Sequence, residues 1–115
     1  MPVFIIMKII TLHTRIDPNE LLNHIRQNID PMFKEQRQTS LHFIVEDYGN
    51  TIKISQPELY GNDVLFNIEV KGRELHITRS EHYVDDVNSL TVESILNDLF
   101  NDLSDKYGTD LVREG

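Results

Sequence analysis

The chain has 115 residues, of which 39% are hydrophobic and 26% charged, a composition typical of a folded globular domain and not of a disordered segment. It contains no cysteine, which excludes disulfide bridges, thiolate metal sites and a cysteine nucleophile. Nineteen acidic residues against eleven basic ones give a net charge of −8, concentrated in residues 81–115 and unfavourable for direct nucleic-acid binding.

The first predicted elements are a strand and a helix. Residues 3–13 are apolar and β-branched with little alternation, which predicts a strand central in a sheet and buried on both faces. Asp17 is a typical N-cap and Pro18 suits the first helical position, so a helix with apolar residues at helical spacing follows. The pair Asp30 and Pro31 predicts a break or kink, with a short further turn beyond it.

From residue 41 the apolar residues alternate with polar ones, which is the period of a half-buried strand. Strands are predicted at 41–46, 51–55 and 64–71, and a return strand contains Leu75 and Ile77. Glycines at the intervening turns favour an antiparallel meander with one apolar and one polar face.

A last helix is predicted from Leu90, with Thr91 as its N-cap, and Gly108 ends it. Residues 109–115 are expected to be a frayed tail. The element order is therefore β-α-β-β-β-β-α. We predict a single α+β domain over residues 1–115, a two-layer sandwich in which two helices cover one face of a mainly antiparallel sheet of about five strands.

Acidic residues gather on this last helix. Asp98, Asp102 and Asp105 follow one another at spacings of four and three residues, and Glu93 precedes them. Like charges at this spacing disfavour a helix, which leaves room for a functional reason beside simple solvation. The hypothesis is that Glu93, Asp98, Asp102 and Asp105 bind a basic patch on a protein partner.

Two other functions remain open. The same acids fit a nucleic-acid mimic that inhibits a protein handling nucleic acid. A small enzyme or metal-binding protein would instead have its site on the polar sheet face, around His42 and His76. However, the sequence contains no catalytic motif, no phosphate-binding glycine loop and no histidine pair at metal-ligand spacing. It thus favours a non-enzymatic module and predicts no catalytic residue, no metal and no cofactor.

The remaining expectations concern partners and location. The apolar run at residues 3–10, together with an edge strand, leaves two possibilities open: a homo-oligomer in which a second copy covers these groups, or a central first strand covered within one chain. That run is too short for a membrane span and lacks the features of a signal peptide, so the protein is expected in the cytoplasm with no membrane partner. Residues 85–88 lack the spacing of a calcium loop and are interpreted as a solubilising loop in which Asp86 or Asn88 seals a turn.

Overall fold

The computed structural model describes residues 4–83 and 85–114 of the chain. In chain order its elements are β1 (Phe4–Leu12), α1 (Pro18–Arg37), β2 (Ile44–Tyr48), β3 (Thr51–Ser55), α2 (Pro57–Tyr60), β4 (Val64–Lys71), β5 (Glu74–Ser80), a 3-10 turn (Glu81–Tyr83), α3 (Val87–Tyr107) and β6 (Thr109–Glu114).

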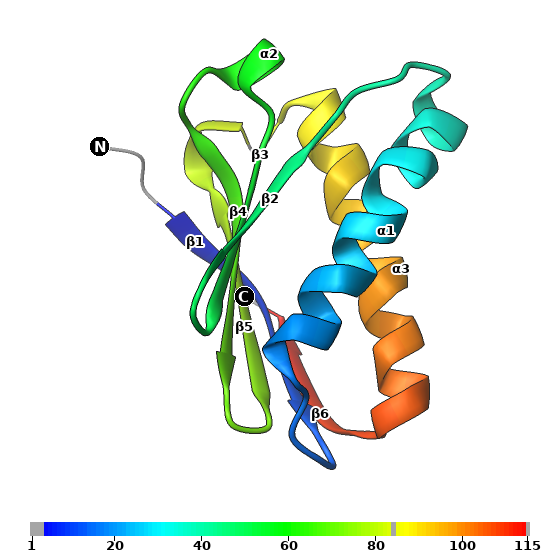
Figure 1. Ribbon diagram of the computed structural model, residues 1–115. Coiled ribbons are helices and arrows are strands. Elements are labelled where there is room, and N and C mark those ends of the chain that lie inside the picture. The colour runs from blue at the N-terminus through cyan, green and yellow to red at the C-terminus, as the bar shows by residue number, and fades with distance from the viewer. Residues whose placement is uncertain (1–3, 84, 115) are drawn as a thin grey trace.

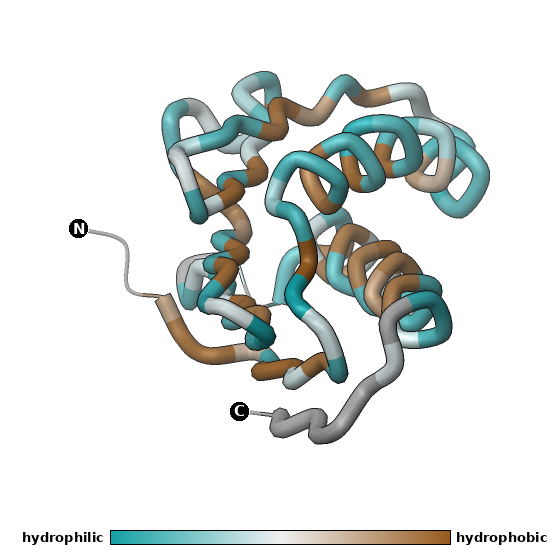
Figure 2. Tube along the Cα trace, turned by 60° about the horizontal axis from the view of Figure 1, so that its bottom comes forward, coloured by the Kyte–Doolittle hydropathy of each residue, from teal (hydrophilic) through white to brown (hydrophobic). Residues whose placement is uncertain are grey.

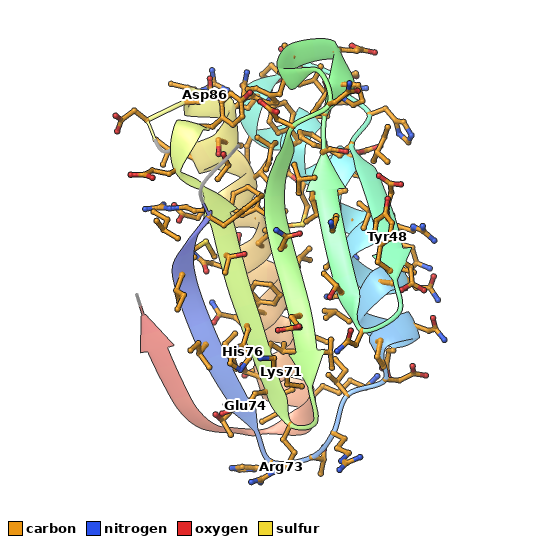
Figure 3. All side chains as sticks on the ribbon, turned by 90° about the vertical axis from the view of Figure 1, so that its left-hand side faces the viewer. Tyr48, Lys71, Arg73, Glu74, His76 and Asp86 are labelled. Atoms are coloured by element: carbon orange, nitrogen blue, oxygen red, sulfur yellow. The ribbon has the colours of Figure 1, made fainter. Side chains whose placement is uncertain are left out.

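The strands form one sheet in the order β2-β3-β4-β5-β1-β6, and every neighbouring pair is antiparallel. The long helices α1 and α3 lie side by side on one face of this sheet (Figures 1 and 2). The opposite face, which we call the open face, carries neither of these helices (Figure 3). The predicted α+β architecture is confirmed, with six strands in the sheet.

The hydrophobic core lies between the helices and the sheet. Alternate strand residues and one stripe of each helix point into it, as the periods of two and 3.6 residues require. Its largest fully buried side chains are Phe33, Phe66, Phe100, Ile10, Leu12, Leu21, Ile25, Ile29, Ile52, Ile54, Leu65 and Ile68.

The predicted break at Pro31 is wrong, because α1 continues through it to Arg37. The start of the helix is as predicted, with Asp17 accepting a hydrogen bond from the backbone N–H of Asn19. A proline inside a helix removes one backbone hydrogen bond. Here tertiary contacts hold the last turns: the ring of Phe33 packs edge-on against Phe43, with 5.1 Å between the ring centres, and Phe33 is fully buried.

Helix α3 begins one turn earlier than predicted. Its N-cap is Asp86 and not Thr91, because the Asp86 carboxylate accepts a hydrogen bond from the backbone N–H of Ser89 at 2.9 Å. Thr91 lies inside the helix and donates its hydroxyl to the carbonyl of Val87. Leu90, predicted to open this helix, lies inside it and is 43% exposed.

The predicted frayed tail is also wrong for residues 109–114, which form β6 and pair with β1. Gly108 makes this return possible through a positive φ of 75°. It also lies so close to β1 that an added Cβ would come within 2.2 Å of the Nδ1 atom of His13. β1 therefore has a neighbour on each side, as predicted for an interior strand. The prediction that both of its faces are buried is wrong, because the helices cover one face only and Ile6, on the open face beside Thr78, is 53% exposed.

Candidate functional site

The outer surface of α3 carries three of the four predicted acidic residues in one stripe. At about 100° per residue, Asp98, Asp102 and Asp105 lie within about 60° of one another around the helix axis. All three are exposed. Within the described part of the chain, the structure gives none of these carboxylates a hydrogen-bond or ion-pair partner.

Glu93 lies on a different flank of the same helix. It is rotated by roughly 120–180° from each of the three aspartates. Its carboxylate is 2.6 Å from the Nη1 atom of Arg79 on β5, and both side chains are largely buried, with 22% and 28% of their surface exposed. Asn97, one turn later on this flank, accepts a hydrogen bond from Lys8 of β1 at 3.0 Å. The structure therefore separates Glu93 from the predicted group and uses it to join α3 to the sheet.

Most acidic residues on the sheet and loops do have partners. On the open face, Glu46 accepts a hydrogen bond from the Tyr48 hydroxyl at 2.9 Å, Glu69 lies 3.2 Å from Lys71, and Glu74 lies 3.1 Å from His76. Each pair is two residues apart on one strand, so both side chains point to the same face. The hydrogen bond to Glu46 raises the pKa of the exposed Tyr48 phenol above its usual value.

The open face also contains a hollow of about 470 Å³. Its lining residues come from four adjacent strands: Tyr48, Thr51, Lys53, Asn67, Glu69, His76 and Thr78. Strand register places Asn67 between Lys53 of β3 and Thr78 of β5. The Lys53 ammonium lies 5.0 Å from the centre of the Tyr48 ring, which is cation–π distance.

The two histidines of the enzyme alternative do not come together. His76 lines the hollow on the open face (Figure 3), whereas His42 lies between α1 and β2 beside a different hollow. The His42 ring is held by Asp30, whose Oδ2 lies 2.8 Å from Nδ1, and the second oxygen of Asp30 accepts the backbone N–H of Phe43. The side chain of His42 is 82% exposed, as expected for an Asp–His pair that fixes a loop.

A second cluster of titratable groups was not predicted, apart from the turn role assigned to Asp86. The Tyr60 hydroxyl donates to Asp86 and the Tyr83 hydroxyl donates to Asp63, with 4.6 Å between the two ring centres. Burial, followed by the hydrogen bond to Asp86, raises the pKa of Tyr60 far above its usual value. The hydrogen bond to Asp63, followed by burial, raises the pKa of Tyr83 to about 12. The first pair joins the end of α2 to the start of α3, and the second joins the 3-10 turn to the residue before β4.

No group of three or more metal-ligating side chains occurs among the residues that the structure describes. Within the same residues, no helix has the length and apolar character that crossing a membrane requires. Comparisons with protein-family models, curated proteins and solved structures find no match to this chain. The function therefore has to be argued from the geometry of its surfaces.

Proposed function

We propose that the protein is a non-enzymatic binding module whose helix α3 engages a basic patch on a protein partner. The observation that carries the proposal is that the unpartnered acids Asp98, Asp102 and Asp105 lie together in one stripe, whereas nine of the other fourteen carboxylates with described side chains have a hydrogen-bond or ion-pair partner. Glu93 is left out of the binding group because it is already paired with Arg79.

The position of the stripe is unfavourable for the helix itself. Neighbouring like charges three and four residues apart repel each other by a few tenths of a kcal/mol per pair. Acids near the C-terminus of a helix also oppose its macrodipole, and Asp105 lies in the last turn of α3. A basic partner would relieve both effects and would be attracted over a distance by the field of the stripe.

Exposed apolar residues at the other end of α3 favour a protein as the partner. Val87 and Leu90, in the first two turns of the helix, are 53% and 43% exposed. Protein interfaces commonly combine apolar anchors with charged groups at their rim. A nucleic-acid mimic would need the acids alone, so contributions of Val87 and Leu90 to binding distinguish the two functions.

The test is capture of partners from lysate of the native host with tagged protein. The variant Asp98→Lys/Asp102→Lys/Asp105→Lys is compared with Glu35→Lys/Asp47→Lys/Glu58→Lys, which makes the same charge change at exposed acids elsewhere. We expect wild type and the control variant to retain a partner with a basic surface that the α3 variant loses. Retention should weaken as salt is raised.

Circular dichroism of all three proteins establishes first that they fold alike. A partner retained by the α3 variant, or lost to the same extent by both variants, would contradict the proposal. Competition of the captured partner by DNA or RNA, together with indifference to Val87→Ser/Leu90→Ser, would favour the nucleic-acid mimic.

A further inference from the structure

The hollow on the open face is a second surface with features of a binding site. Its volume of about 470 Å³ lies within the range of small-molecule sites, roughly 300–1,000 Å³. Cross-strand neighbours in an antiparallel sheet are about 5 Å apart, so the register of Lys53, Asn67 and Thr78 sets three polar side chains in one row. A second row runs through Thr51, Glu69 and His76. These rows lie on regular strands, which favours a largely preformed site.

The charges around the hollow disfavour an ionic ligand. Three carboxylates, those of Glu46, Glu69 and Glu74, lie on the open face of a molecule whose net charge is already −8. An anion would therefore be repelled on approach. A cation would find all three carboxylates already engaged, by Tyr48, Lys71 and His76, and would also meet the ammonium group of Lys53. A neutral ligand avoids both penalties.

The polar groups call for a ligand that both donates and accepts hydrogen bonds. The Lys53 ammonium forms no ion pair with a described carboxylate and can donate, and the hydroxyls of Thr51 and Thr78 can do either. The Oδ1 atom of Asn67 is shielded from solvent and has no hydrogen-bond partner among the described residues. The NH2 group of the same amide is free to donate to a ligand in the hollow, since no described residue accepts a hydrogen bond from it.

Tyr48 supplies an apolar surface at the edge of the same hollow. Its side chain is exposed, at 55%, and its hydroxyl is held by Glu46, which fixes the direction of the ring. Exposed tyrosines combine an apolar ring with a polar tip and favour ligands of mixed character. A pyranose ring has this character, because its C–H groups form apolar patches and its hydroxyls both donate and accept.

We propose that this hollow binds an uncharged saccharide, with its hydroxyls hydrogen-bonded to Lys53, Asn67 and Thr78 and its ring against Tyr48. The site lies on the face of the sheet away from α3, so it is independent of the acidic stripe. Because the hollow is open to solvent, binding should be weak, with a Kd of the order of 1 mM.

Two-dimensional amide NMR of the full chain tests this assignment. The probes are the methyl glycosides of glucose, galactose, mannose and N-acetylglucosamine, each raised to about 50 mM, well above the Kd expected. Glucuronate and inorganic phosphate are the charged comparisons. We expect at least one uncharged glycoside to shift amides of β3, β4 and β5, and to bind more tightly than either anion.

Variants then identify the groups responsible. Asn67→Ala and Lys53→Met should each raise the Kd by about fivefold or more, a change well within the precision of a titration. Lys34→Met, an exposed lysine on α1, should leave it unchanged. The spectrum of each variant also reports whether it is folded. The proposal is overturned if no uncharged glycoside shifts these amides, if an anion binds more tightly, or if the shifts persist unchanged in both hollow variants.

Discussion

Asp86 is the residue on which several elements depend at once. Its carboxylate accepts the backbone N–H of Ser89 and the hydroxyl of Tyr60, so it caps the start of α3 and anchors the end of α2. Tyr60 in turn packs against Tyr83, whose own hydroxyl is bound to Asp63. The neighbouring Asp85 is exposed and has no partner among the described residues, although the sequence presents the two as equivalent.

Asp86→Ala should therefore destabilise the protein by about 1–3 kcal/mol, since it removes a helix cap and leaves a part-buried phenol without its acceptor. Asp85→Ala, the matched control, should change the free energy of unfolding by less than about 0.5 kcal/mol. Urea denaturation followed by circular dichroism measures both. Equal losses for the two variants would show that Asp86 is not the N-cap.

The raised pKa of Tyr83 predicts that the protein loses stability at alkaline pH. The folded pKa of Tyr83 is raised from 10.0 to about 12, so the folded state favours the neutral phenol. The stabilisation of the fold by the neutral Tyr83 phenol is fully present below pH 10 and is lost as the pH rises through about 12. Wild type should thus lose more stability over this interval than Tyr83→Phe, which has no phenol to ionise.

The measurement is the free energy of unfolding at several values of pH, with tyrosinate absorbance recorded in parallel. Tyr48→Phe is the control, because its phenol is exposed and water screens the interaction with Glu46. It should follow the wild-type curve closely. A Tyr83→Phe curve parallel to that of wild type would refute the coupling.

At the scale of elements, α1 does more than cover the sheet. Arg26 donates two hydrogen bonds to the carbonyl of Val45, and Asp30 accepts the N–H of Phe43. β2 is an edge strand, and unpaired backbone groups at sheet edges invite association with other chains. The helix therefore protects this edge through residues that precede Pro31, and Phe33, beyond the proline, adds its ring contact with Phe43.

Pro31→Ala should stabilise the protein by about 1–2 kcal/mol. It restores the backbone hydrogen bond that proline removes, and this gain exceeds the smaller loss from a more flexible unfolded chain. Pro18→Ala, at the first position of the same helix, should give no such gain, because proline is favoured there. Thermal unfolding compares the two, and a lower Tm for Pro31→Ala would show that the proline is required for the path of α1.

The same elements mark what the sequence predicts well and what it does not. The periodicity of apolar residues is sufficient to predict both long helices and the strands of the meander, because each of these elements buries one regular face. Local propensity misplaced the ends. It assigned a break to Pro31, where the packing of Phe33 overrides it, and it could not foresee that β1 offers the tail an open edge for pairing.

For the molecule as a whole, the acidic residues divide into those that form ion pairs or hydrogen bonds within the fold and those that are exposed without such a partner. The sequence groups Glu93 with the three aspartates because all four lie on one predicted helix. Helical spacing already places Glu93 on another flank of α3, but that this acid meets a cation depends on the position of Arg79 on β5, which helical spacing does not show. Glu93 forms an ion pair within the fold, whereas Asp98, Asp102 and Asp105 have no cationic partner among the described residues and repel one another.

Replacing an acid by its amide should consequently have opposite effects on stability in the aspartate stripe and at Glu93. Asp98→Asn/Asp102→Asn/Asp105→Asn should stabilise the protein by about 0.5–1 kcal/mol at low salt, through relief of repulsion and of the unfavourable helix dipole. The gain should shrink at about 1 M salt, where the screening length falls to about 3 Å. Glu93→Gln should destabilise it instead, because Arg79 already has one buried nitrogen without a partner and would lose its carboxylate. Thermal unfolding of both variants at low and high salt measures these effects. A destabilised triple variant would mean that the three aspartates support the fold, and the binding role proposed for them would then lose its physical basis.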